Sequence, residues 1–128
     1  MKSRDSVIRL KRFHVEEKRR QVAQIEMMIA EFERMAKDLD DQILVEQQRS
    51  GIHDAGHFAY PTFAKAAMQR RDNLNASAGE LKERLAAAKA DHDEAVEDLH
   101  KQEAIAERDH GGDKNMAPKT TEVAAAAR

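Results

Sequence analysis

Apolar residues recur every seven positions between Ile8 and Ile43, and other apolar residues often follow three positions later. This is the heptad pattern of a coiled-coil helix, in which the core positions are named a and d. No glycine or proline lies between Ser3 and Arg49, so we expect one uninterrupted helix over about residues 3–49. The a positions are Ile8, Val15, Val22, Ile29, Ala36 and Ile43, and the d positions include Ile25, Phe32 and Leu39 as well as the polar Lys11, Lys18 and Glu46.

A turn and a second helix follow. Residues 50–61 hold two of the five glycines and one of the two prolines and have no helical periodicity, which predicts the turn. Residues 62–110 carry a second, alanine-rich heptad pattern, which predicts a helix that can approach the first one closely. Its d positions are Leu74, Leu81, Ala88 and Ala95, and its a positions are Ala78, Leu85, His92, Leu99 and Ala106.

The expected fold is therefore all-α: two long helices that form an antiparallel coiled-coil hairpin over residues 1–110. Residues 111–128 begin with Gly111 and Gly112 and lack apolar periodicity, so we expect a disordered tail there. In antiparallel pairing the numbers of facing residues add up to a constant, and a turn centred near residue 55 favours about 110, with 117 as the competing register. The register of 110 places Ile29 against Leu81 and Val22 against Ala88.

Charge also favours antiparallel pairing. Residues 1–20 carry eight bases and three acids, a net charge of +5, and residues 80–109 carry ten acids and five bases, a net charge of −5. The turn brings these two segments together in either register, which places Lys18 near His92 and its neighbours Asp91 and Asp93.

Composition excludes several classes of protein. Charged residues make up 36% of the chain and aromatic residues 4%, with five glycines and two prolines, which is too few aromatic and turn-forming residues for a β-sandwich or barrel. The absence of cysteine excludes disulfides, thiolate catalysis and cysteine zinc sites. No apolar run is long enough to cross a membrane and the charged N-terminal residues do not resemble a signal peptide, so we expect a cytoplasmic protein.

The sequence offers no set of residues for catalysis, so we expect no enzyme, cofactor, metal or small-molecule substrate. His53 and His57 lie four residues apart, but Gly51 and Gly56 flank them and the glutamate of a helical zinc motif is missing. His92 at an a position is more typical of a polar core residue that sets the register than of a catalytic base.

Nucleic acid is not an expected partner either. Glu16 and Glu17 interrupt the basic stretch between Arg9 and Arg20, and the acidic second helix would neutralise much of its positive field.

Large apolar residues also lie outside the core positions. Leu10 and Phe13 occupy c and f positions, where a two-stranded coiled coil needs polar residues. Phe58, Tyr60 and Phe63 bring three of the five aromatic residues together at the bend. They fit two interpretations equally well: a staple that closes the turn, and a tip that binds a partner.

Several stretches of the chain resemble the FliJ family of flagellar export proteins, in its alphaproteobacterial form. They are MKSRDSVIRLKRF at residues 1–13, VEEKRRQVAQIE at 15–26, GIHDAGHFAYPTFAKAA at 51–67 and QRRDNL at 69–74. The resemblance covers about residues 1–109, and it lies in overall similarity over these stretches.

The resemblance implies a component of the flagellar type III export apparatus, similar to the coiled-coil stalk of rotary ATPases. Family members insert their helical ends into the hexameric export ATPase and stimulate it, engage the export gate at the membrane and recycle export chaperones. It implies a cytoplasmic location with peripheral association at the inner membrane, at the flagellar base. The alternative is a general coiled-coil scaffold or spacer without an ATPase partner. The candidate partner-binding residues are Arg4, Ile8, Leu10, Lys11, Arg12 and Phe13 at the N-terminal end and Phe58, Tyr60 and Phe63 at the bend.

Overall fold

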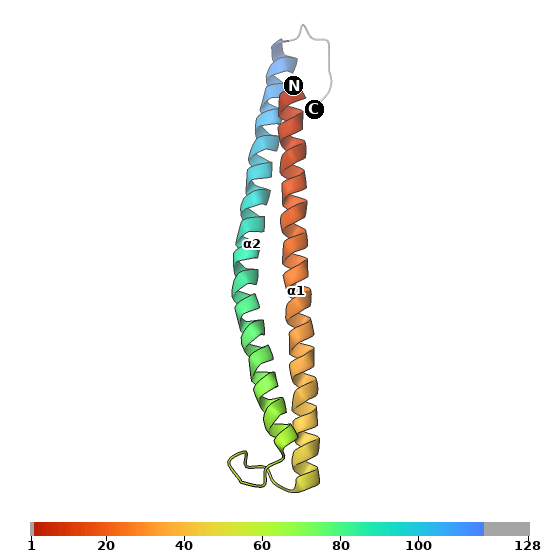
Figure 1. Ribbon diagram of the computed structural model, residues 1–128. Helices are drawn as coiled ribbons and strands as arrows, with labels where there is room; N and C mark the ends of the chain where they lie inside the picture. Colours follow the sequence, from red (N-terminus) through yellow and green to blue (C-terminus); the bar gives the residue numbers. More distant parts are fainter. Residues whose placement is uncertain (1, 117–128) are drawn as a thin grey trace. The chain divides into compact units, whose positions relative to one another are not determined.

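The fold consists of two long helices that pack against each other, α1 over Lys2–Ser50 and α2 over Thr62–Met116 (Figure 1). It is taken from a computed structural model, which describes the backbone of residues 2–116 and the side chains of residues 3–110. The predicted all-α hairpin is confirmed. No helix within residues 2–116 is both long and apolar enough to span a membrane.

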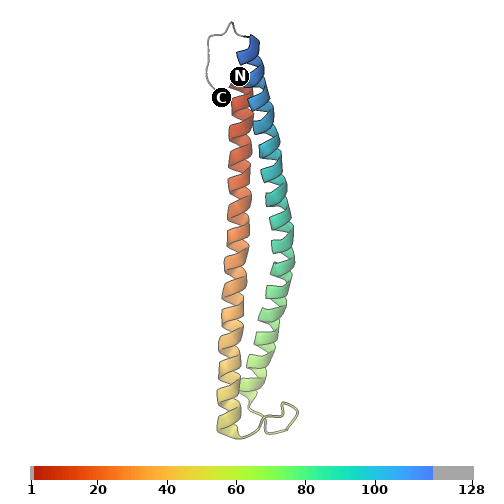
Figure 2. The ribbon, with the colours of Figure 1, turned by 180° about the vertical axis from the view of Figure 1, so that it is seen from behind.

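The contacts divide the chain into two compact units. Unit 1 joins the start of α1 to the second half of α2, with residues 2–20 and 89–116 described, and unit 2 is Gln21–Ala88 with the bend. Within each unit a segment of α1 lies beside a segment of α2 that runs in the opposite direction (Figures 1 and 2).

Local chemistry explains where the helices stop and start at the bend. Gly51 follows α1 with a φ of 77°, a left-handed conformation that glycine adopts without a steric penalty. Its N–H donates a hydrogen bond to the Gln47 carbonyl at 2.8 Å, which caps the last turn. The carbonyl of Pro61 accepts the first bond of α2 from Lys65 N–H at 3.1 Å. The predicted start of the second helix near Thr62 is confirmed.

The far end of α2 differs from the prediction. The helix continues through Gly111 and Gly112 to Met116, six residues beyond the predicted end at about 110. Each glycine weakens a helix by about 1 kcal/mol relative to alanine but does not forbid it. Extending an existing helix is also far cheaper than nucleating one. The part of the predicted tail from residue 117 onward lies outside the described residues.

The buried residues of unit 2 follow the heptads, with Tyr60 at the bend as the addition. In α1 the a positions Ile29, Ala36 and Ile43 are buried, whereas the a position Val22 and the d position Leu39 are only half-buried. Alanine dominates the facing side of α2, which lets the helices approach closely. The buried residues of this unit are Ile29, Ala36, Ile43, Tyr60, Ala64, Ala67, Ala78, Leu81 and Ala88.

Ion pairs between the helices show which residues of α1 and α2 face each other. In unit 2, Arg71 Nη1 lies 2.9 Å from Asp40 Oδ1, and these residue numbers add up to 111. In unit 1, Lys11 pairs with Asp98 and Lys18 Nζ lies 4.0 Å from Asp91 Oδ2, and both pairs add up to 109. These three pairs agree with the register near 110, and the pairs Arg4–Asp109, Arg12–Glu103 and Glu33–Lys82 add up to 113, 115 and 115. The expected proximity of Lys18 and Asp91 is confirmed.

Candidate functional site

An exposed apolar row lies on the N-terminal part of α1, in unit 1. Val7, Leu10 and Phe13 are spaced by three residues, so a helix brings them onto neighbouring positions of its surface. Their exposed fractions are 36%, 65% and 58%, whereas the neighbouring Ile8 is buried against α2. The row therefore faces away from the helix pair. We refer to these three residues as the apolar row.

The other candidate residues of this end contact α2. Arg4 Nη1 donates a hydrogen bond to Gln102 Oε1 at 2.9 Å, and Arg12 Nη2 lies 3.2 Å from Glu103 Oε2. Lys11 Nζ donates to Asp98 Oδ2. Of the six N-terminal candidates, Leu10 and Phe13 are thus the two whose side chains are turned outward and make no contact that the helix pairing requires.

The Lys11 contact makes the pairing sensitive to acid. The hydrogen bond from Lys11, assisted by the positive charge of Lys11, holds the pKa of Asp98 below its ordinary value. A carboxylate with a lowered pKa stabilises the folded state above its unfolded-state pKa of about 3.9 and loses that contribution as the pH falls through the folded-state value.

We therefore expect Asp98→Asn to destabilise the protein at neutral pH and to have little effect well below pH 3.9. Thermal unfolding of the wild type and the variant, followed by circular dichroism between neutral and acid pH, measures this difference. An equal difference at every pH would contradict the proposed role of the Asp98 charge.

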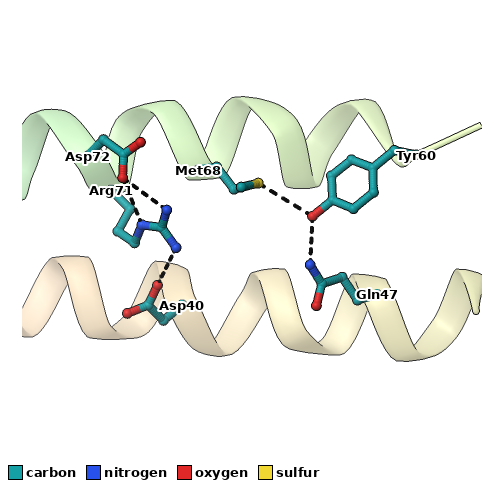
Figure 3. A network of polar contacts seen from close by, with 6 residues as sticks. All are labelled: Asp40, Gln47, Tyr60, Met68, Arg71 and Asp72. Carbon is teal, nitrogen blue, oxygen red and sulfur yellow. Dashed lines mark hydrogen bonds and ion pairs between the residues drawn. The ribbon is translucent and has the colours of Figure 1, made fainter. Parts of the chain in front are cut away.

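A buried tyrosine closes the bend in unit 2. Tyr60 is 6% exposed, and its hydroxyl accepts a hydrogen bond from Gln47 Nε2 at 2.9 Å. The same hydroxyl donates to Met68 Sδ at 3.5 Å, so the side chain connects α1 to α2 (Figure 3). Of the two interpretations of the aromatic cluster, Tyr60 fits the staple.

The other two aromatic residues of the bend are exposed. Phe58 is 96% exposed and stacks on the ring of His57, with ring centroids 4.7 Å apart. The loop beneath it is held by Asp54, which accepts hydrogen bonds from Gly56 N–H at 2.9 Å and from His57 N–H at 3.0 Å. Phe63 at the start of α2 is also exposed. A partner-binding role for Phe58 and Phe63 stays a prediction.

An arginine in the heptad core of unit 2 joins the helices near the bend. Arg71 occupies an a position of α2 and bonds to Asp40 of α1 and to Asp72, each at 2.9 Å (Figure 3). These hydrogen bonds raise the pKa of Arg71, first that to Asp40 and then that to Asp72. This contact was not predicted from the sequence, although the arginine at an a position departs from the apolar heptad pattern and is the signal that could have revealed it.

The histidines that the sequence singles out have other partners. His53 Nδ1 lies 3.4 Å from Gln47 Oε1, and His57 Nδ1 accepts a hydrogen bond from Ala59 N–H at 3.0 Å. His92 is half-buried in the helix pair, with Nδ1 3.5 Å from Asp93 Oδ1. Over the described residues, no group of three or more His, Asp or Glu side chains could hold a metal ion.

A scan against protein-family models and searches of curated proteins and of solved structures found no match.

Proposed function

We propose that this protein is a non-enzymatic component of the flagellar type III protein export apparatus. In this role it is a stalk-like coiled coil that stimulates the hexameric export ATPase and links it to the membrane export gate and to export chaperones. It acts in the cytoplasm and associates peripherally with the inner membrane at the flagellar base. The sequence stretches that resemble the FliJ family and the helical hairpin support this proposal.

The observation that carries the proposal is the apolar row. Leu10 and Phe13 expose large apolar side chains at positions where a coiled coil that acts alone needs polar residues. Covering apolar surface contributes about 25 cal/mol for each Å² removed from water, so such side chains favour binding of another protein. They lie near the start of α1, the end that the family resemblance assigns to the ATPase.

The exposed aromatic residues at the bend support the proposed link to the export gate and to chaperones. Phe58 and Phe63 are exposed on a loop and helix start that Tyr60 and Asp54 hold in place. An ordered loop loses little conformational freedom when a partner covers its aromatic side chain. We assign the contact with the gate or with chaperones to this end.

The decisive experiment is a titration of the ATP hydrolysis rate of the cognate flagellar export ATPase with this protein. We expect stimulation by the wild type and its loss in the double variant Leu10→Ser, Phe13→Ser. Both side chains are exposed, so the variant should keep the helicity of the wild type, which circular dichroism checks.

The matched control is Leu44→Ser, Val45→Ser, which removes two exposed apolar side chains of α1 in unit 2. It should stimulate the ATPase like the wild type. If the wild type neither changes the rate nor co-sediments with the ATPase, the protein is a coiled-coil scaffold or spacer without an ATPase partner. If both double variants lose stimulation equally, the apolar row is not the contact.

A further inference from the structure

Apolar burial is unevenly divided between the two units. Nine of the buried apolar residues lie in unit 2, but only Ile8 and Ala95 are buried among the described residues of unit 1. Val15 and Leu99, core positions of unit 1, are half-buried. Because apolar burial is the main stabilising term in helix pairing, unit 1 needs another source of attraction.

Ion pairs provide that attraction in unit 1. Arg4, Lys11 and Lys18 occupy three successive d positions of α1, seven residues apart, where a coiled coil normally has apolar side chains. Each reaches a carboxylate of α2: Arg4 Nε lies 3.8 Å from Asp109 Oδ2, Lys11 Nζ 2.5 Å from Asp98 Oδ2 and Lys18 Nζ 4.0 Å from Asp91 Oδ2. A fourth pair joins Arg12 to Glu103. We refer to these four pairs as the charge ladder.

The two sides of the ladder carry equal and opposite net charges. Residues 2–20 hold eight bases and three acids, and residues 89–110 hold eight acids and three bases, so the net charges are +5 and −5. All eight ladder residues remain partly exposed to water. Exposed ion pairs are individually weak and lose strength as salt shortens the range of electrostatic forces, whereas buried apolar contacts do not depend on charge.

We propose that unit 1 is an electrostatic clasp: residues 2–20 separate from residues 89–110 when the charge ladder is screened or reversed, while the helices of unit 2 stay paired. In the closed state the cationic side chains at the d positions of α1 are paired with carboxylates of the same chain. In the open state Arg4, Lys11 and Lys18, together with the a positions Ile8 and Val15, become available at once. The clasp is thus a built-in switch between a paired and an accessible N-terminal segment. It does not depend on the export function proposed above.

Distances between pairs of spin labels test the clasp, since the sequence has no cysteine to interfere with labelling. Ser6→Cys with Ala104→Cys places one label on each helix of unit 1, and Ala30→Cys with Ala76→Cys does the same in unit 2. All four side chains are small and exposed. Pulsed electron resonance then reports each distance in the full-length protein.

Charge reversal is the main arm of the experiment. Lys11→Glu with Lys18→Glu places like charges opposite Asp98 and Asp91, and we expect loss of the short distance in unit 1 with no change in unit 2. Adding Asp91→Lys and Asp98→Lys restores opposite charges and should restore the short distance. The matched control, Arg9→Glu with Arg108→Glu, changes the net charge by the same amount at exposed residues outside the ladder and should leave the clasp closed.

Salt is the second arm. Raising the ionic strength from 0.01 to 1 M shortens the Debye length from about 30 to about 3 Å. The wild-type distance in unit 1 should broaden towards longer values while that in unit 2 stays constant. The proposal is overturned if charge reversal leaves the unit 1 distance short, if the fourfold variant stays open, if the control variant opens equally, or if both units open together.

Discussion

Tyr60→Ala is expected to lower the free energy of unfolding by about 3–5 kcal/mol, the range for removing a large buried aromatic side chain. Tyr60 is the only aromatic residue among the buried residues of the described chain, and it lies where the bend meets α1 and α2. Its loss leaves a cavity and removes the acceptor of the Gln47 hydrogen bond. Urea unfolding followed by circular dichroism measures the change.

Two further variants test the role of Tyr60. One removes only its hydroxyl, and the other is a control at an exposed aromatic residue of the same loop. Tyr60→Phe keeps the ring and removes only the hydroxyl, so it should cost about 1 kcal/mol, the typical net value of one hydrogen bond. Phe58→Ala removes an aromatic side chain of similar size from the same loop, but Phe58 is exposed and the change should stay within about 0.5 kcal/mol. A Phe58 variant as unstable as the Tyr60 variant would show that the staple is assigned to the wrong residue.

The fold could be predicted because the heptad pattern, the turn residues and the charge distribution all indicate the same structure. The heptads predict the helices, Gly51 and Pro61 predict their ends at the bend, and the opposite charges predict antiparallel pairing. The end of α2 is the exception, because Gly111 and Gly112 weaken a helix without setting a limit to it. A glycine pair is a weaker stop signal than a glycine that must adopt a positive φ, as Gly51 does.

The candidate site could be predicted only in part. The outward direction of Leu10 and Phe13 follows from their c and f positions, since those positions lie farthest from the partner helix. The separation of Tyr60 from Phe58 does not follow from sequence, because neighbouring aromatic residues in a loop have no periodicity that distinguishes buried from exposed. The contacts of Gln47 with Tyr60 and of Tyr60 with Met68 likewise depend on the conformation of the loop.

Charged residues at core positions of the heptads carry information about the register. Lys11 and Lys18 at d positions indicate weak core packing at that end of the first helix. Once the register is known, the same two positions also indicate which carboxylates of α2 the lysines pair with, Asp98 and Asp91. Arg71 at an a position of α2 is the corresponding case in unit 2, with Asp40 as the partner. In both units the polar residues of the core therefore specify the register, a role that such residues have in coiled coils.

The register predicts that Ile29 and Leu81 are energetically coupled. Ile29→Ala and Leu81→Ala each remove a buried aliphatic side chain of unit 2 and should each lower the free energy of unfolding by about 2–5 kcal/mol. The register near 110 places these two residues in one layer, so the double variant should differ from the sum of the single effects by about 0.5–3 kcal/mol. Urea unfolding of the four proteins completes the cycle.

Leu74 is the matched control for this cycle. It occupies the same heptad position as Leu81 one heptad earlier in α2, which puts it about 10 Å away along the helix axis. Ile29→Ala with Leu74→Ala should therefore be additive within about 0.5 kcal/mol. In the register of 117, Ile29 would instead face Ala88 and Leu81 would face Ala36. If the effects of Ile29→Ala and Leu81→Ala on the free energy of unfolding are additive, the two residues lie in separate layers and do not share a cavity. That result would contradict the register that the Arg71 and Asp40 ion pair indicates.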